Sequence, residues 1–435
     1  QMIKTLKGYV CCLTLLGLLV AEASAGDATT GLPIAAVEIR GNRYTQDFVI
    51  QRELVTRTGR HFDPESLAAD LQRLDNLDIF SSLAAQVQRR ADDSVTVVLQ
   101  IRELPPVVPY ISYDVNDQDG WSFGPAVKSV NLLGRDVFLA GYALFGGRES
   151  FLLDLSQPWW RGNHLSFDLD VSRNIRQNEL DGFEETTTEI TPRIGLWLGQ
   201  HGRASMVASY MRIGADLPQV LLSGANEDEL YRLGASVGYD SRDVWGNPHR
   251  GWLNEIEIWK TGGLLPGDGD FWTLHADIRR FQPVGEHTLV WAGLTSLQPG
   301  TMGRQVPVYM DYHLGGANSL RGYVVDDLGL ELFGAHQMLT TIEYRIPLLQ
   351  PREIRLFGLS ADIGLGGTVF VDGGLAWTKS DDFELERARF GTGTGIRILL
   401  PAIDMTRIEI GYGEDGWRLY LATFSKMRAQ RLRLR

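Results

Sequence analysis

The residues of this sequence that could do chemistry do not form a recognised catalytic set. No H-E-x-x-H zinc motif, no G-x-S-x-G nucleophile motif and no P-loop occurs, and the eight histidines are scattered along the chain. A structural role therefore explains each histidine better than metal ligation does. We expect no enzymatic activity, no metal and no cofactor, and an enzyme is the less favoured alternative.

One glycine-rich segment superficially resembles a nucleotide-binding loop. Gly391, Gly393 and Gly395 alternate with threonines, but a dinucleotide loop must follow a strand and open a helix, and this segment has a strand-like pattern on both sides. We interpret these glycines as positions where a strand curves tightly and is closely packed on one face.

Composition and charge narrow the class of protein. The chain has 435 residues and a formal net charge of -12, from 42 basic and 54 acidic side chains. It lacks the basic stripe of a nucleic-acid binder, so no nucleic-acid partner is expected. A high glycine content, 48 residues, together with 10% aromatic residues, favours β structure.

The N-terminal segment has the three-part layout of a secretory signal peptide. Two lysines precede an apolar run over residues 9–20, and Ala23-Ser24-Ala25 then offers a cleavage site, so the mature chain is expected to start near Gly26. A membrane anchor is the alternative, but a spanning helix needs about 20 apolar residues. Cys11 and Cys12, the only cysteines, lie inside this segment, so a mature chain without a disulfide is expected.

Tryptophan placement divides the chain into two unlike parts. Residues 26–105 contain no tryptophan, and all 11 lie at or beyond Trp121. In the first part, Asp63-Pro64 marks a helix start, with an N-cap and a proline at the first helical position. The pattern predicts a small α+β domain with a strand at 35–40, helices at 45–55 and 64–75, and strands at 83–89 and 94–101. The expected organisation is a signal peptide over 1–25, an N-terminal segment over 26–33, the α+β domain over 34–104, a second domain over 107–424 and a basic tail over 425–435.

The second part alternates apolar and polar residues with period two. Residues 165–171, 272–278 and 407–412 are examples, and about 16 such segments fit between residues 107 and 424. A soluble sandwich would also alternate. Charges in the polar set suit a wet lumen, and aromatic residues at segment ends suit membrane girdles, so we predict an all-β transmembrane barrel of about 16 antiparallel strands. The charges include Asp168, Asp277 and Glu409, and the aromatics are Trp159, Trp160, Trp252 and Trp377.

Three motifs in this part carry a family likeness. The segment from His313 to Tyr323, HLGGANSLRGY, resembles the sixth extracellular loop signature of the BamA/TamA-type outer-membrane assembly superfamily, the bacterial surface antigen barrels. YDSRD at 239–243 with Gly251-Trp252, and FVDGG at 370–374, resemble two strand motifs of the same superfamily. The α+β domain resembles its periplasmic POTRA module. A single POTRA also resembles the mitochondrial sorting barrel, but the signal peptide argues for a bacterial outer membrane.

The resemblance implies a role for the loop tetrapeptide Leu320, Arg321, Gly322 and Tyr323 inside the barrel. Arg321 would reach lumenal acids, for which alternation supplies Glu343 and Asp372. A guanidinium offers five donors in a rigid fork and can hold two carboxylates. The alternative is a solvated loop arginine.

The expected function is assembly or insertion of outer-membrane proteins without chemical turnover. The POTRA edge, at Leu83, Ala85 and Val87, would take an extended client segment by β-augmentation. The barrel must close between residues 110–115 and 417–424, where Pro109 removes one donor and weakens the seam. The seam residues are Tyr110, Ile111, Tyr113, Leu419, Leu421 and Phe424.

The expected partners follow from this function. They are unfolded outer-membrane or secreted polypeptides, membrane lipid and accessory periplasmic proteins. The alternative function is a translocation pore that moves a polypeptide or a lipid through the lumen. The two differ in whether the seam or the lumen is the route.

Overall fold

The structure is a computed structural model that describes residues 29–116, 120–161, 164–178, 182–324, 332–356, 359–379, 382–399, 406–414 and 416–422. The expected signal peptide over 1–25, the basic tail over 425–435 and the seam residue Phe424 lie outside the described residues.

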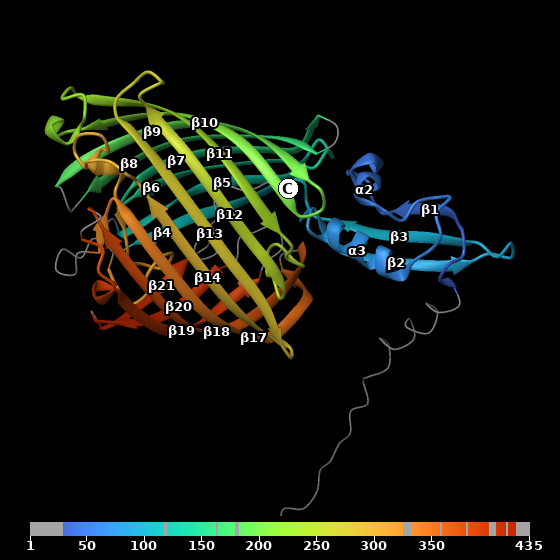
Figure 1. The fold of residues 1–435 in the computed structure, drawn as a ribbon. Helices are drawn as coiled ribbons and strands as arrows, with labels where there is room; N and C mark the ends of the chain where they lie inside the picture. The colour runs from blue at the N-terminus through green and yellow to red at the C-terminus, as the bar shows by residue number, and fades with distance from the viewer. Residues whose placement is uncertain are drawn as a thin grey trace, which may run out of the picture.

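A small α+β domain comes first in the chain (Figure 1). Its three-stranded sheet has the order β1-β3-β2, with β1 parallel and β2 antiparallel to the central strand β3. At the start of α3, Asp63 caps the helix by accepting from the backbone N–H groups of Glu65 and Ser66. The elements are β1 (Ile34–Arg40), α2 (Asp47–Glu53), α3 (Pro64–Asp75), β2 (Phe80–Arg89) and β3 (Val95–Glu103).

The first helix begins later than the sequence predicts. Thr45 was expected to be helical, but its backbone N–H donates to Oε1 of Glu103 at 2.5 Å. The backbone N–H of Gln46 donates to the carbonyl oxygen of Gly134 at 2.9 Å, in the other domain. These long-range partners hold the two residues outside the helix, with Gln46 extended as the N-cap, so α2 begins at Asp47.

The second domain is one antiparallel sheet of 16 strands, curved into a barrel, which confirms the fold class expected from the sequence (Figure 1). Every neighbouring pair in its order, which runs from β21 to β4, is antiparallel. The strands are β4 (Val108–Asn116), β5 (Gly120–Leu132), β6 (Val137–Gly146), β7 (Glu149–Arg161), β8 (Leu165–Asn178), β9 (Phe183–Leu198), β10 (Gly202–Ala215), β11 (Glu227–Asp240), β12 (Gly251–Gly262), β13 (Asp270–Val284), β14 (His287–Leu297), β17 (His336–Leu356), β18 (Leu359–Trp377), β19 (Arg389–Leu399), β20 (Thr406–Gly413) and β21 (Gly416–Ala422).

The remaining described elements are short and lie in the connections between strands. They are the 3-10 turns η1 (Pro218–Val220), η2 (Val308–Met310) and η4 (Leu385–Arg387), and a two-stranded hairpin of β15 (Tyr312–His313) and β16 (Phe333–Gly334).

The barrel is apolar outside and polar inside, the reverse of a soluble domain. Met206 is 72% exposed and Ile111 is 75% exposed, whereas Glu255 and Asp277 are buried. An outward band of large apolar side chains needs lipid to cover it, and this arrangement is that of a membrane barrel. The soluble sandwich is thereby set aside. Within the described residues, no helix is long and apolar enough to cross a membrane.

Two of the four expected girdle tryptophans do not face outward. Trp160 and Trp252 are on the outer surface, 50% and 37% exposed. Trp377 is buried because the rings of His336 and Phe383 cover it, with centroids at 5.3 and 4.9 Å. Trp159 instead packs under the guanidinium of Arg52 from the α+β domain, 4.8 Å from the ring centroid to Cζ.

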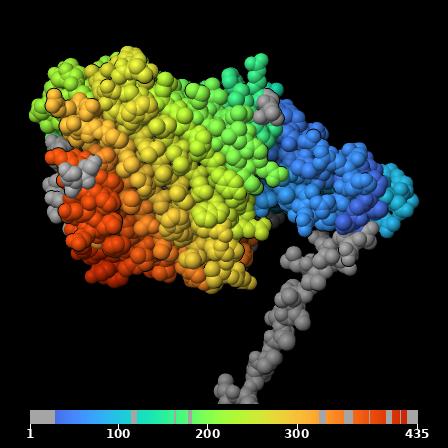
Figure 2. Space-filling view, in the orientation of Figure 1, coloured from blue at the N-terminus to red at the C-terminus, as the bar shows by residue number. Residues whose placement is uncertain are grey.

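The α+β domain packs against one end of the barrel (Figure 2). Arg52 of α2 donates to Asp136, in the turn between β5 and β6, at 2.7 Å. On the other side, the amide of Asn76, just after α3, donates to the carbonyl oxygen of Asp243 and accepts from the N–H of Trp245, both at 3.1 Å. Two separate turns of the barrel therefore hold the domain.

Candidate functional site: an arginine loop inside the barrel

The connection between β14 and β17 folds into the barrel instead of extending away from it. The connection includes the hairpin of β15 and β16, and after β15 come Leu314 and Leu320, which are both fully buried. Together with Tyr323, they pack on residues of the neighbouring strands, which include Ala292, Leu339 and Ala376. The loop is thus held first by apolar contact with the inner wall.

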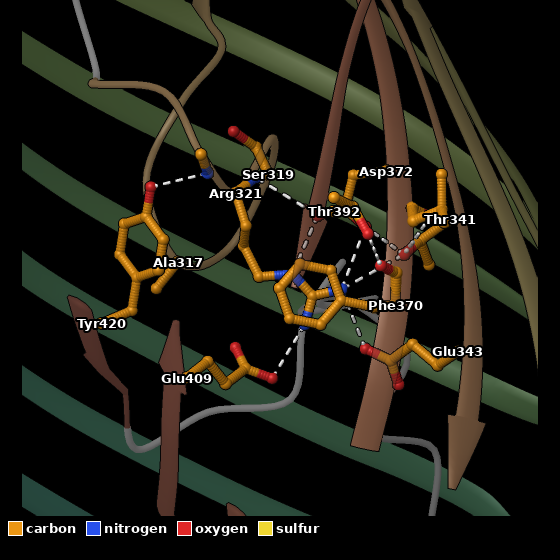
Figure 3. Close-up of polar contacts among 12 residues, drawn as sticks. Ala317, Ser319, Arg321, Thr341, Glu343, Phe370, Asp372, Thr392, Glu409 and Tyr420 are labelled. Atoms are coloured by element: carbon orange, nitrogen blue, oxygen red, sulfur yellow. Dashed lines mark hydrogen bonds and ion pairs between the residues drawn. The ribbon is translucent and has the colours of Figure 1, made fainter. Parts of the chain in front are cut away.

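Arg321 lies at the centre of this site with no exposed surface (Figure 3). Its Nε and Nη2 donate to the two oxygens of Asp372 at 2.8 and 2.9 Å, a bidentate pair. Nη1 donates to Glu409 at 2.8 Å, and Nη2 lies 3.2 Å from Glu343. The ring of Phe370 stacks on the guanidinium, with Cζ 3.2 Å from its centroid.

Two of the three carboxylates are shared with a second arginine. Glu343 also accepts from Arg345 at 2.9 Å, and Glu409 also accepts from Arg407 at 2.8 Å. Arg407 reaches back to the loop, where it donates to the side-chain oxygen of Asn318 at 2.8 Å. Three arginines and three carboxylates are therefore joined in one network. A fourth buried arginine, Arg397 on β19, lies close enough to interact with the charges of Glu343 and Glu409.

A bed of glycines on β19 and β20 lets the loop backbone lie directly on the wall. A Cβ added at Gly391 would be 1.9 Å from the carbonyl oxygen of Arg321. A Cβ at Gly413 would be 2.6 Å from the carbonyl oxygen of Gly322. Gly322 itself has φ of 101°, a conformation that other residues rarely adopt. The alternating glycines seen in the sequence thus provide close approach.

The loop also contacts the last strand of the barrel. The hydroxyl of Tyr420, in β21, accepts from the N–H of Gly322 at 2.8 Å and donates to the carbonyl oxygen of Tyr323 at 3.2 Å. Tyr323 in turn donates its hydroxyl to the carbonyl oxygen of Phe390 at 2.9 Å.

The structure brings together Arg321, Glu343 and Asp372, which the sequence singled out. Sequence reasoning missed Glu409, although the residue had been noted on the polar face of an alternating strand. It also missed Phe370 and Tyr420, for which a period-two pattern gives no signal.

The expected seam residues lie on strands that are not paired with each other. Tyr110, Ile111 and Tyr113 are in β4, and Leu419 and Leu421 are in β21. These two strands end the order of the sheet, and within the described residues no ladder joins them. Ile111 and Leu419 both point outward, at 75% and 72% exposed.

The expected client edge lies on β2, which is an edge strand of the small sheet. Leu83, Ala85 and Val87 are partly buried and pack against the core of the domain. Their side chains are therefore used in folding, and what the edge offers to another chain is its backbone.

The YDSRD motif builds one of the turns that hold the α+β domain. Asp240 accepts from Arg203 at 3.1 Å and from Arg242 at 2.8 Å. The side chain of Asp243 accepts from three backbone N–H groups of its own turn, at Val244, His249 and Arg250. This turn is the one that Asn76 contacts.

Comparison with known proteins identifies the family. Residues 131–415 match the Omp85 superfamily domain, and residues 32–104 match the POTRA family, described as a surface antigen variable number repeat. The chain belongs to the Omp85 superfamily. The likeness expected from the sequence is confirmed. Omp85 proteins are outer-membrane barrels with periplasmic POTRA domains, so this chain is an outer-membrane protein whose POTRA domain lies in the periplasm.

One curated relative and two solved structures are similar over most of the chain. The outer membrane protein assembly factor BamA of Nitratidesulfovibrio vulgaris is 24% identical over 407 residues, 88% of this chain and 49% of that protein. The chain thus spans about half the length of the curated relative it matches. BamA from Haemophilus ducreyi lacking POTRA domains 1-3 has a TM-score of 0.57 at 15% identity, covering 90% of this chain and 83% of that chain.

CdiB from Escherichia coli has a TM-score of 0.59 at 13% identity, covering 91% of this chain and 74% of that chain. The solved structures share the fold of this Omp85 barrel. The curated relative is described as an outer membrane protein assembly factor.

Proposed function

We propose that the protein is an outer-membrane assembly factor that takes client strands at the β2 edge of its POTRA domain and at the seam between β4 and β21, without chemical turnover. Its clients are unfolded outer-membrane or secreted polypeptides. Its other partners are membrane lipid and accessory periplasmic proteins. The observation that carries the proposal is the seam, where no ladder joins the described residues of β4 and β21, beside a lumen that the Arg321 loop occupies.

The backbone at the seam could serve an incoming strand. A strand edge offers a row of N–H and C=O groups, so the edges of β4 and β21 that face the seam can template a client strand. The POTRA edge offers the same chemistry on the periplasmic side.

The alternative function is translocation of a polypeptide or a lipid through the lumen. The polar inner wall is compatible with this route, but the loop would have to leave the lumen. Arg321 would then lose its contacts with the three carboxylates on the barrel wall. Breaking a buried ion pair is costly, so the seam is the favoured route.

A disulfide lock across the seam tests the proposal. Cysteines would be introduced at Ile111 or Tyr113 in β4 and at Leu419 or Leu421 in β21, with Cys11 and Cys12 replaced by serine. The readout is insertion of an unfolded outer-membrane protein into lipid vesicles that contain the full chain. Oxidation should abolish insertion, and reduction should restore it.

The matched control is a cysteine pair at Phe123 and Phe145, which are exposed register partners on β5 and β6. This lock joins strands that are already paired and should leave insertion unchanged. If the seam-locked protein inserts clients at the normal rate, the lateral mechanism is wrong and the lumenal route replaces it.

A further inference from the structure

The last strand of the barrel is held from the inside as well as along its ladder. β21 pairs with β20 on one side, and within the described residues no ladder joins it to β4 on the other. Tyr420 is the strand's inward side chain at this level, 6% exposed. Figure 3 shows its ring directed at the loop backbone beside Arg321.

The hydroxyl of Tyr420 makes two hydrogen bonds to that backbone. It accepts from the N–H of Gly322 at 2.8 Å and donates to the carbonyl oxygen of Tyr323 at 3.2 Å. A buried hydroxyl that both donates and accepts in this way fixes the position of both backbone groups. The contact needs a bare wall at Gly411, where a Cβ would be 2.8 Å from the N of Gly322 and 3.1 Å from the ring of Tyr420.

The same stretch of loop is fastened to three other strands. Arg321, next to Gly322, binds Glu343 on β17, Asp372 on β18 and Glu409 on β20. A continuous path of ion pairs and hydrogen bonds therefore runs from β17 through the loop to β21, and it does not depend on the ladder between β20 and β21.

We propose that Tyr420 is a positioning residue that couples the Arg321 loop to the seam. While the loop is seated, Tyr420 holds β21 against the wall. When the loop leaves, both hydrogen bonds are lost, and β21 keeps its β20 ladder without this support from the inside. This inference rests on the proposed function in one respect, namely that the β4–β21 seam is the route for clients.

Hydrogen–deuterium exchange of the full chain in lipid nanodiscs tests the coupling, with Tyr420→Phe as the variant. The substitution keeps the ring and removes only the hydroxyl. Amides of β21 should exchange about tenfold faster, since two hydrogen bonds of ordinary strength are lost, while β8 to β13 should exchange as before. Arg321→Ala should raise the exchange rate of the β21 amides in the same way. The double variant should exchange at nearly the same rate as Arg321→Ala.

The matched control is Tyr412→Phe. Tyr412 is 46% exposed on the outer face of β20 and touches β21 through the ring of Trp417, with centroids 4.9 Å apart. Loss of its hydroxyl should leave the exchange rates of the β21 amides unchanged. A second variant, Gly413→Ala, attacks the same contact from β20, because the added Cβ would be 2.6 Å from the carbonyl oxygen of Gly322. Its control is Gly366→Ala, where the nearest atom lies 3.5 Å away.

Two results would overturn the coupling. One is equal exchange of β21 in the parent, Tyr420→Phe and Gly413→Ala proteins. The other is an equal rise in exchange over all strands, which would make the hydroxyl a general structural group. The measurement uses no client, so a negative result here leaves the disulfide-lock experiment standing. A failed lock, in turn, leaves the coupling measured here intact.

Discussion

Arg321 is the residue on which the position of the loop depends. Its guanidinium lies fully buried among three carboxylates, and two of these are shared with Arg345 and Arg407. The desolvation of such a network offsets much of its Coulomb energy, so its net contribution to stability is small. We expect its main effect to be on the position of the loop, because moving Arg321 would leave Asp372, Glu343 and Glu409 without this partner.

Replacement of Arg321 should therefore be costly. We expect Arg321→Ala to lower the free energy of unfolding by about 3–5 kcal/mol, since uncompensated buried charges remain. Arg321→Lys should rescue only in part, because a lysine cannot make the bidentate pair with Asp372. Heat-modifiability and limited proteolysis of residues 298–324 measure both effects.

The contacts of Arg321 with its carboxylate partners predict which partner substitution costs more stability, and that the costs of paired substitutions do not add. Asp372 receives both Nε and Nη2 of Arg321, whereas Glu343 also binds Arg345, so Asp372→Asn should cost more than Glu343→Gln. Arg321→Ala combined with Asp372→Asn should cost less than the sum of the two. Additive effects, or a parent loop cut as readily as the variant's, would mean that Arg321 is a solvated loop residue.

A single methyl group on the glycine bed should displace the loop. Gly391→Ala places a Cβ where the carbonyl oxygen of Arg321 now lies, so we expect loss of loop protection from protease and about 1–3 kcal/mol of destabilisation. Gly214→Ala is the control, because its nearest neighbour would be 3.7 Å away. Equal protection of the loop in both variants would contradict the role of the bed.

At the scale of elements, α2 and the end of α3 dock on a row of aromatic and arginine side chains that contact one another at the barrel rim. Arg52 lies over Trp159, whose ring centroid is 3.7 Å from that of His164. His164 packs in turn on Trp197 at 5.1 Å. Arg203 then lies between Trp197 and Trp245, whose backbone N–H binds Asn76. The row thus connects the two turns that hold the POTRA domain.

Removal of Arg52 should loosen this docking. Arg52→Ala leaves Asp136, which is fully buried, without its arginine and removes the cation over Trp159. We expect a cost of about 3 kcal/mol to the docked state. Spin-label distances between the POTRA domain and the barrel should broaden. Arg40→Ala, which removes an exposed pair with Glu38, should leave them sharp, and equal distributions in the two variants would contradict the docking role.

Docking should also weaken in acid. Burial, together with the charge of Arg52, lowers the pKa of His164 to about 4. When the POTRA domain undocks, His164 of the barrel loses the nearby charge of Arg52, so its pKa rises toward 6.5 and the undocked state binds the extra proton first. The contribution of neutral His164 to the stability of the docked state is fully present above pH 6.5 and is lost as the pH falls toward 4. The same distance measurement at pH 7 and pH 5 checks this, and His164→Phe should remove the pH dependence.

At the scale of the whole molecule, the outer surface of the barrel has the apolar side chains that contact with lipid requires. β10 shows this on one strand, with Met206 72% exposed six residues before Arg212, which is exposed toward the end of the strand and pairs with Glu227. A charge is tolerated at the interface of a bilayer and not at its centre. The outward band therefore sets the depth of the barrel in the membrane.

Arginine substitutions on this face should report that depth. Met206→Arg should destabilise the barrel in lipid vesicles by about 2–4 kcal/mol, and Tyr210→Arg, closer to Arg212, by about 0–1 kcal/mol. Equilibrium unfolding from vesicles measures both. Equal costs for the two variants would mean that this face does not lie across the bilayer.

Period-two alternation is a local property, and it was sufficient to predict the barrel. Side chains on successive residues of a strand point to opposite faces, so the sequence determined the number of strands and which residues face the lumen. The POTRA elements were equally readable, because Asp63 and Pro64 mark a helix start in any context. The helix at 45–55 was predicted too long, since the partners of Thr45 and Gln46 are Glu103 and Gly134.

Only the tertiary structure decided which lumenal acids meet Arg321. Asp168, Asp277 and Glu409 alternate in the same way, but Glu409 alone among them binds the guanidinium, from 88 residues away in the chain. That choice depends on the register of every strand pair between the two residues and on the curvature of the whole sheet. Neither property can be recognised in a short stretch of sequence. The same curvature brings Tyr420 beside Gly322 and Asn76 beside Trp245, and neither contact could be read from spacing.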